Sequence, residues 1–451
     1  MNKRSIYNLN NSQVLRFYQG RMHTHDANWI TAERIYSELL REEISNPEFR
    51  FKVVQELGTA CYFLDKLEEA IAAYQQCLEI LQESDDKSKL GWTTHKLADI
   101  FAKQGKIELA IEYYEKSRTL FESVDEQYGV AWSLQREGEA YRIQGLYQKA
   151  EQTLLRALNI WQHSQMDWDI GTALSTLGDV YRHWGYLEKA LVCYRQGQEI
   201  YRRQENKYGL GWCMHGMGEI YRMQGFFCQA EQHSTQSKEH FSEMQYSYGI
   251  YWNIYALAEL SRMQRRLEEA IQMFNECITV FQDIQDEYGV SYGLQGLGEA
   301  YHAQGQLDKA LELYQQSLVI AEKNDDNHLK GRIFRNIGEV FRKKGNTVTS
   351  KKYLDESISL FTVQRSYYQI GICNYYLGKL MENERQFNTA QDVYLSALEE
   401  AKKQNDIYHQ LLVLTRLHAI ANVTGNKLPN IVMEAQELTN EYPHLLEVLE
   451  I

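Results

Sequence analysis

The segment LGDVYRHWGYLEKALVCY (Leu177–Tyr194) carries a small residue, an aromatic residue, a glycine and an alanine at Gly178, Tyr181, Gly185 and Ala190. The same pattern returns every 40 positions, and nine units keep one register without an insertion. The first small column is Gly58, Ala98, Gly138, Gly178, Gly218, Ala258, Gly298, Gly338 and Gly378, and the second is Ala70, Ala110, Ala150, Ala190, Ala230, Ala270, Ala310, Ser350 and Ala390. A fixed period of this length is the signature of a repeat architecture.

Each 40-residue repeat is predicted to form two helices. In the third 40-residue repeat, apolar residues occur at helical spacing in Val130 to Gln144 and in Tyr147 to Trp161, and Gly145 lies between these two segments. A glycine there suits the left-handed residue that ends a helix. One such hairpin cannot bury its apolar face alone, so neighbouring units are expected to stack.

Composition agrees with an all-helical chain. The only prolines are Pro47, Pro429 and Pro443, so no proline interrupts a helix between residues 48 and 428. The chain has 451 residues, more than one hydrophobic core usually supports, and no linker rich in Pro, Gly or Ser divides it. Growth along one dimension as a repeat array is therefore predicted.

The small–aromatic–Gly–Ala framework of Leu177–Tyr194 resembles the tetratricopeptide repeat family over about residues 50–410. The period of 40 is longer than the usual 34, and the proline of that family between repeats is missing. This longer variety looks like the arrays of G-protein regulatory adaptors, kinesin light chains and the sensor tails of signalling ATPases. The resemblance implies an all-α, right-handed superhelical solenoid that binds peptides or proteins in a concave groove.

Three parts are expected along the chain. Residues 1–50 are predicted to form an N-terminal helical cap, 51–407 nine repeats of 40 residues, and 408–451 a C-terminal helical cap. Solenoids need such caps because a terminal repeat otherwise exposes an apolar face.

Charge and cysteine content narrow the class of partner and the compartment. A net charge of −13 argues against a nucleic-acid partner, which calls for a basic surface. The seven cysteines have no CxxC spacing and are odd in number, which suggests reduced thiols. The N-terminus lacks the apolar run of a signal peptide, and no segment is apolar enough to span a membrane. A cytoplasmic location without membrane contact is expected.

A second set of recurring residues is not needed for packing and lies on one stripe of each first helix, because its members are three and four positions apart. The resemblance places this stripe in the groove. The candidate ligand-binding residues are Trp92, Trp132, Trp212, Trp252 and Tyr292, then His215 and Tyr255, then Glu139, Asp179, Glu219, Glu259 and Glu299, and last Arg142, Arg182, Arg222, Arg262 and Arg342.

Two interpretations of these columns stay open. The acidic and basic residues either brace the superhelix as a ladder of ion pairs or bind carboxylates of a ligand. The tryptophans either pack between repeats or anchor apolar side chains of a ligand. A further column at the joints between units, Tyr128, Trp168, Tyr208, Tyr248, Tyr288, His328, Tyr368 and Tyr408, is interpreted as packing.

No catalytic or metal-binding constellation stands out. The sequence has no GxxxxGK[ST], HExxH or GxSxG motif, and the Glu and Arg residues belong to a repeated series. No enzymatic activity, cofactor or metal is therefore predicted. The leading hypothesis is a scaffold or adaptor that binds a protein or peptide in its groove. The alternative is a peptide-sensing regulator of a separate effector, such as the sensing subunit of an enzyme.

Overall fold

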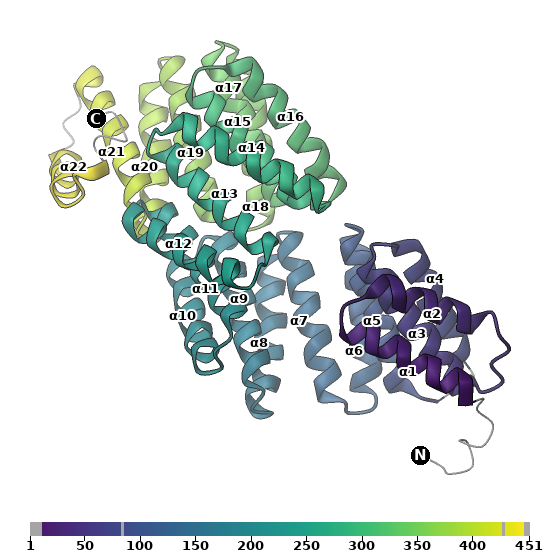
Figure 1. Ribbon diagram of the computed structural model, residues 1–451. Helices are drawn as coiled ribbons and strands as arrows, with labels where there is room; N and C mark the ends of the chain where they lie inside the picture. The colour runs from purple at the N-terminus through teal and green to yellow at the C-terminus, as the bar shows by residue number, and fades with distance from the viewer. Residues whose placement is uncertain (1–10, 83–84, 426–428, 446–451) are drawn as a thin grey trace. The chain divides into compact units, whose positions relative to one another are not determined.

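The computed structural model describes residues 11–82, 85–425 and 429–445, and all their regular structure is helical (Figure 1). The helices are α1 (Asn11–His25), α2 (Trp29–Leu40), α3 (Pro47–Phe63), α4 (Leu67–Leu81), α5 (Lys87–Lys103), α6 (Ile107–Glu122), α7 (Gln127–Ile143), α8 (Tyr147–His163), α9 (Asp167–Trp184), α10 (Leu187–Arg203), α11 (Lys207–Gln224), α12 (Phe227–Glu243), α13 (Ser247–Met263), α14 (Leu267–Asp283), α15 (Glu287–Ala303), α16 (Leu307–Lys323), α17 (Asn327–Lys343), α18 (Thr347–Val363), α19 (Tyr367–Asn383), α20 (Phe387–Lys403), α21 (Ile407–Thr424) and α22 (Pro429–Glu441). The prediction of an all-α fold of consecutive helix pairs is confirmed.

The turns inside and between hairpins both use left-handed residues. Inside the hairpins the predicted glycines take positive φ, from 74° at Gly145 to 94° at Gly185. Between hairpins the left-handed position recurs every 40 residues but is never glycine, as at Gln165 (φ 53°) and Glu205 (φ 51°). A side chain in this conformation is strained. The sequence pattern revealed the first kind of turn and not the second, because no single residue type marks the second.

The two small columns bring paired helices into close contact. Gly178 of α9 lies under the ring of Tyr194 on α10, and a Cβ built on this glycine would come within 2.6 Å of the ring. Ala190 is completely buried at the same contact. The contact thus pairs a glycine of the first helix with a large ring of the second, and this ring is not the aromatic residue of the 40-residue pattern, which is Tyr181 on the first helix.

The chain divides into two compact units, which are described separately. Unit 1 comprises residues 1–140 and 155–160, and unit 2 comprises residues 141–154 and 161–451. In unit 1, α1 and α2 lie in the range predicted for the N-terminal cap, and α3 begins at Pro47 after Asn46, whose side chain accepts a hydrogen bond from Phe49 N (2.9 Å). In unit 2, α21 and α22 lie in the range of the C-terminal cap. The capping roles remain predictions.

In unit 2, residues that are 180 or 181 positions apart in the sequence contact one another. The Tyr147 hydroxyl lies 2.8 Å from His328 Nδ1, and Trp184 Nε1 donates to the carbonyl of Arg365 (3.0 Å). Gln224 Nε2 likewise donates to the carbonyl of Gln404 (3.0 Å). We call this set the closing contact. It joins the turns α7–α8, α9–α10 and α11–α12 to the joints α16–α17, α18–α19 and α20–α21, and the repeat pattern did not predict it.

Candidate functional site

The predicted stripe forms one face of each first helix. On α11 it comprises Trp212, His215, Glu219 and Arg222, which share a face because they are three or four residues apart. We call this face, with its equivalents at 40-residue spacing, the inner face. In unit 2 it extends along α9, α11, α13, α15, α17 and α19.

The charged residues of the inner face form a charge ladder in unit 2. Arg222 binds Glu219 on its own helix (Nη2–Oε2, 2.8 Å) and lies 3.6 Å from Glu259 of the next repeat. Arg262 repeats the arrangement with Glu259 (2.9 Å) and Glu299 (2.8 Å). Each arginine therefore connects two repeats, which is the geometry of the bracing interpretation. Ligand binding by these residues stays a prediction.

The central carboxyls of the charge ladder are buried, and its ion pairs control their ionisation. Glu259 is 1% exposed and Glu219 is 6% exposed. Burial alone would raise the pKa of Glu219, but Arg222, His215 and Arg182 hold this pKa at about 2. Burial opposes ionisation of Glu299 as well, and Arg262, Arg332 and Arg335 hold its pKa at about 2. These carboxylates are charged at neutral pH and depend on their arginines.

Stability should fall in two steps as the pH is lowered. Burial lowers the pKa of His215 and, together with nearby arginines, that of His183 and His328, so stability is lost first as the pH falls below about 6.5, the value of free histidine. The pKa values of Glu219 and Glu299 are lowered from 4.5 to about 2, so their contribution is complete above pH 4.5 and is lost between about 4.5 and 2. Urea unfolding midpoints at a series of pH values measure this. A midpoint that stays constant from pH 7 to 3 would contradict it.

The charge ladder changes at both ends. At α9, Arg182 lies 3.3 Å from Asp179, which accepts a hydrogen bond from the Tyr194 hydroxyl (2.7 Å). At α17, Arg342 binds Glu339 (2.6 Å), and Lys379 of α19 binds the same carboxylate (2.7 Å). Lys379 occupies the position at which earlier repeats have an acid. The 40-residue spacing leads to this position, but its lysine was not predicted as a site residue because it breaks the acidic column.

Unit 1 carries a different set of pairs. The Trp92 indole donates to Glu126 (2.9 Å), and Asp99 accepts from the Tyr114 hydroxyl (2.8 Å). Glu139 binds Arg136 (3.1 Å), whose guanidinium lies 6.0 Å from the ring centroid of Trp132. Arg136 was not predicted as a site residue, because it lies outside the basic column. Arg142 of α7 belongs to unit 2 and is half-buried.

The aromatic column packs between repeats. Trp212 contacts Phe241 (ring centroids 5.0 Å) in its own repeat and Tyr248 (5.9 Å) at the next joint. Trp252 contacts Phe281 (5.2 Å) and Tyr288 (5.7 Å) in the same way. This is the geometry of the packing interpretation, and the role in ligand binding stays a prediction.

Exposure separates the candidate residues into two groups. Trp252, Tyr255, Tyr292, His215, Glu219 and Glu259 are buried, whereas Trp92, Trp132 and Trp212 are half-buried. Asp179 keeps 42% of its side chain exposed, Arg262 20% and Arg182 17%. Solvent therefore reaches part of the inner face from α9 to α13.

The joint column is not uniformly packed. Tyr368 is 4% exposed and His328 is 6% exposed, both within the closing contact, whereas Trp168 is 46% exposed and Tyr208 is 42% exposed. Tyr208 nevertheless packs at its joint against Phe241 (ring centroids 6.3 Å) and Tyr246 (5.4 Å), so its exposure does not contradict the interpretation as packing. Position along unit 2 decides the difference, because only the later joints meet the closing contact.

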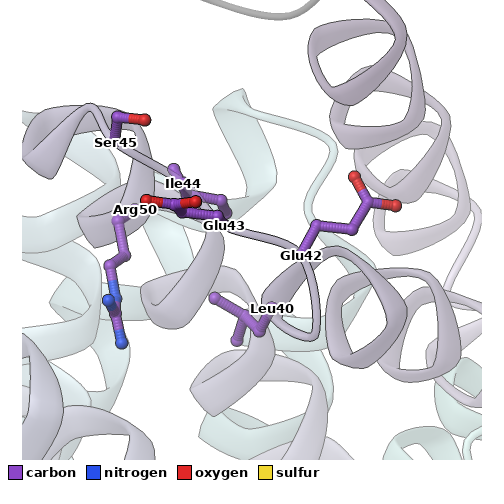
Figure 2. A pocket seen from close by; sticks show the side chains of 6 residues that line it. All are labelled: Leu40, Glu42, Glu43, Ile44, Ser45 and Arg50. Atoms are coloured by element: carbon purple, nitrogen blue, oxygen red, sulfur yellow. The ribbon is translucent and has the colours of Figure 1, made fainter.

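The structure shows two other features that bear on function. Within the described residues, no group of three or more His, Cys, Asp and Glu side chains has the arrangement to hold a metal ion, and none of the helices is long and apolar enough to cross a membrane. A cavity of about 190 Å³ in unit 1 is lined by Leu40, Glu42, Glu43, Ile44, Ser45 and Arg50 (Figure 2). Its charged side chains do not converge, since Glu42 is bound by Arg16 (2.6 Å) and points away from Arg50 (Figure 2).

Comparison with known proteins supports the repeat assignment. The sequence matches the family described as tetratricopeptide repeat over residues 53–123, 89–163, 129–203, 169–243, 250–323 and 289–362, which together span more than half of the chain. No curated protein matches the sequence. The narrower resemblance to kinesin light chains, G-protein adaptors and signalling ATPases stays a prediction.

Two solved structures share the fold at low sequence identity. The apo form of the quorum sensor NprR from B. thuringiensis is similar with a TM-score of 0.52 and 15% identity, covering 77% of this chain and 97% of that chain. The Rap conjugation gene regulator of the plasmid pLS20, in complex with the Phr* peptide, is similar with a TM-score of 0.54 and 15% identity, covering 78% and 96%.

Proposed function

Because the chain belongs to the tetratricopeptide repeat family, we propose that it is a protein-binding scaffold or adaptor that holds a peptide segment of a partner against the inner face of unit 2. The observation that carries this proposal is the accessible part of that face. Asp179, Arg182 and Arg262 keep exposed area there, beside the half-buried Trp212. Tryptophan and arginine are the residue types that contribute most at binding hot spots.

The candidate residues divide into two proposed roles. The accessible side chains contact the ligand directly. The buried side chains, such as Glu259 and Trp252, hold the repeats at the spacing that keeps the inner face in register. A reducing, cytoplasmic location fits the cysteines, because all seven are free thiols and six of these are buried.

A second candidate function is peptide-sensing regulation of a separate effector. The two solved structures named above support it, since one is described as a quorum sensor and the other as a gene regulator bound to a peptide. The closing contact supports it further, because a ligand that changes the spacing of the repeats also strains this contact. Such a ligand would then favour an open or a closed form of unit 2.

Affinity purification from the native host, followed by mass spectrometry, tests binding to the inner face. We expect Asp179→Arg to lose the partner that the wild-type chain retains, because the substitution reverses the charge of the most accessible acid of the charge ladder. Circular dichroism checks that the helical content of the variant is unchanged.

The matched control is Glu231→Arg on α12, an exposed acid on a second helix. It makes the same charge change away from the inner face and should retain the partner. Loss of the partner from both variants would point to a general charge effect. Retention by both would place the binding surface elsewhere and refute the proposal.

A further inference from the structure

Helix α1 has the packing of a first helix of a repeat. A Cβ built on Gly20 of α1 would come within 2.5 Å of the Tyr36 ring on α2, and a Cβ built on Gly58 of α3 would come within 2.9 Å of the Tyr74 ring on α4. The two contacts are alike, and their residues lie 38 positions apart in the sequence. Each position of α1 therefore corresponds to the position of α3 that lies 38 residues later.

Two apolar residues of α1 are exposed at positions that the repeat buries. Leu15 is 63% exposed and Met22 is 67% exposed. The corresponding residues of α3, Val53 and Ala60, are completely buried, because α2 packs against them in one hydrophobic cluster. Within residues 11–82 no helix precedes α1, so the face that a preceding second helix would cover is exposed.

Tyr18 completes an apolar stripe on this face. It is 57% exposed and lies three residues after Leu15 and four before Met22, so the three side chains share one side of α1. We call these three residues the α1 patch. The last described helix differs, since the exposed residues of α22 are Asn430, Met433, Gln436, Glu437, Asn440 and Glu441. The outer face of a solenoid end is normally polar, as on α22, so the α1 patch needs a cover.

The charges beside the α1 patch indicate what covers it. Helix α1 contains two arginines and two histidines and has no Asp or Glu, and Arg21 and His25 are exposed next to the patch. A second α1 packed on this face would bring like charges together, and the exposed side of α22 offers Met433 alone as an apolar contact. A partner with acidic residues beside an apolar stripe fits better.

The size of Tyr18 sets a further requirement. On α11 the position that corresponds to Tyr18 is Gly216, and a Cβ built there would lie 2.3 Å from the ring of Tyr194 on the covering helix α10. In that contact the covered helix supplies the small residue and the covering helix supplies the ring. On α1 the ring belongs to the covered helix, so the covering helix must supply the small residue.

We infer that the α1 patch docks an amphipathic helix of another protein. The helix places a small residue against Tyr18 and larger apolar residues against Leu15 and Met22, and acidic residues flank this stripe. It takes the place of the second helix of a preceding repeat and completes the N-terminal cap. This surface goes beyond the proposed function, because α1 belongs to unit 1 and the proposed peptide site belongs to unit 2.

A designed helical peptide tests the docking surface on the full chain. The acidic peptide has alanine in the middle of its apolar stripe, leucine at both ends of the stripe, and glutamate at its outer positions. The basic peptide has lysine in place of each glutamate. In fluorescence anisotropy we expect wild type to bind the acidic peptide at least about tenfold more tightly than the basic one. Equal affinities would overturn the inference.

The variant Leu15→Gln/Met22→Gln locates the binding. It should lose at least about tenfold in affinity for the acidic peptide and keep the melting temperature of wild type, because both side chains are exposed. Hydrogen exchange of the α1 backbone amides reports the site directly. The acidic peptide should slow this exchange in wild type and leave it unchanged in the variant. Unchanged exchange in wild type would overturn the inference.

The matched control is Val319→Gln/Val348→Gln on α16 and α18, where both valines are exposed. It removes two exposed apolar side chains from other helices and should keep the affinity for the acidic peptide. An equal loss in this control would show a general effect of surface hydrophobicity and overturn the inference.

Two further measurements exclude other occupants of the α1 patch. Sedimentation equilibrium of wild type should give the same mass as Leu15→Gln/Met22→Gln. A dimer that this variant dissociates would show that the patch joins two copies of the chain. Flotation with vesicles of phosphatidylglycerol should leave both proteins unbound, and binding by wild type alone would assign the patch to a lipid surface. Either result would overturn the inference.

Discussion

Arg262→Ala is expected to lower the free energy of unfolding of unit 2 by about 3–5 kcal/mol. Arg262 lies between Glu259 and Glu299 and is within 2.9 Å of both carboxylates. Glu259 is 1% exposed, so removal of the guanidinium leaves a buried carboxylate with a weaker set of partners. The cost of an uncompensated buried charge exceeds the worth of most surface ion pairs by several fold.

Urea unfolding followed by circular dichroism measures this loss. The control is Arg202→Ala on α10, which breaks an exposed pair with Glu199 (2.9 Å) and should cost less than about 1 kcal/mol. Adding Glu259→Gln to Arg262→Ala should restore part of the stability, because the amide carries no charge. Equal effects of Arg262→Ala and Arg202→Ala would show that the charge ladder does not brace the repeats.

The same reasoning applies to Arg222. The sequence alone did not distinguish a role in bracing the repeats from a role in binding a ligand for this residue. Arg222 contacts Glu219 and Glu259, so its removal affects two repeats in the same way. A loss of ligand binding in an Arg222 variant therefore does not separate the two roles. Asp179→Arg is a better test, because Asp179 keeps 42% of its side chain exposed and pairs with Arg182 on its own helix (3.3 Å).

The sequence predicted those features that depend on neighbours within one repeat. Gly178 and Ala190 mark the hairpin because close helix contact needs small residues at fixed spacing, and Gly145 and Gly185 mark the turns because their φ is positive. The columns of the inner face also follow from spacing within one helix. Local periodicity was sufficient for each of these.

The sequence did not predict features that depend on how unit 2 meets itself. Tyr147 and His328 are far apart along the chain, and no pattern links them. The burial of Tyr368 and the exposure of Tyr208, members of one column, differ for the same reason. Arg332 and Arg335 were visible as departures from the repeat, but only the structure shows that both help to hold the pKa of the buried Glu299 low.

Gly185→Ala is expected to lower the free energy of unfolding by about 3 kcal/mol or more, since two costs add. Gly185 has φ of 94°, a conformation that costs a residue with a Cβ about 1–2 kcal/mol. The new Cβ would also lie 2.3 Å from the Cβ of Tyr368, which belongs to the closing contact. Either the turn between α9 and α10 or the start of α19 must move.

Gly305→Ala is the matched control for this substitution. Gly305 also ends a helix with positive φ (80°), but nothing lies within 4 Å of the position that the new methyl group would take, so only the backbone cost of about 1–2 kcal/mol applies. Urea unfolding compares the two variants, and hydrogen exchange of the backbone amides at the start of α19 reports the closing contact directly. Faster exchange there in Gly185→Ala alone would show that the closing contact holds unit 2 together. Equal losses of stability and unchanged exchange would show that the two turns differ only in their backbones, and the proposed link between ligand binding and the closing contact would then lose its support.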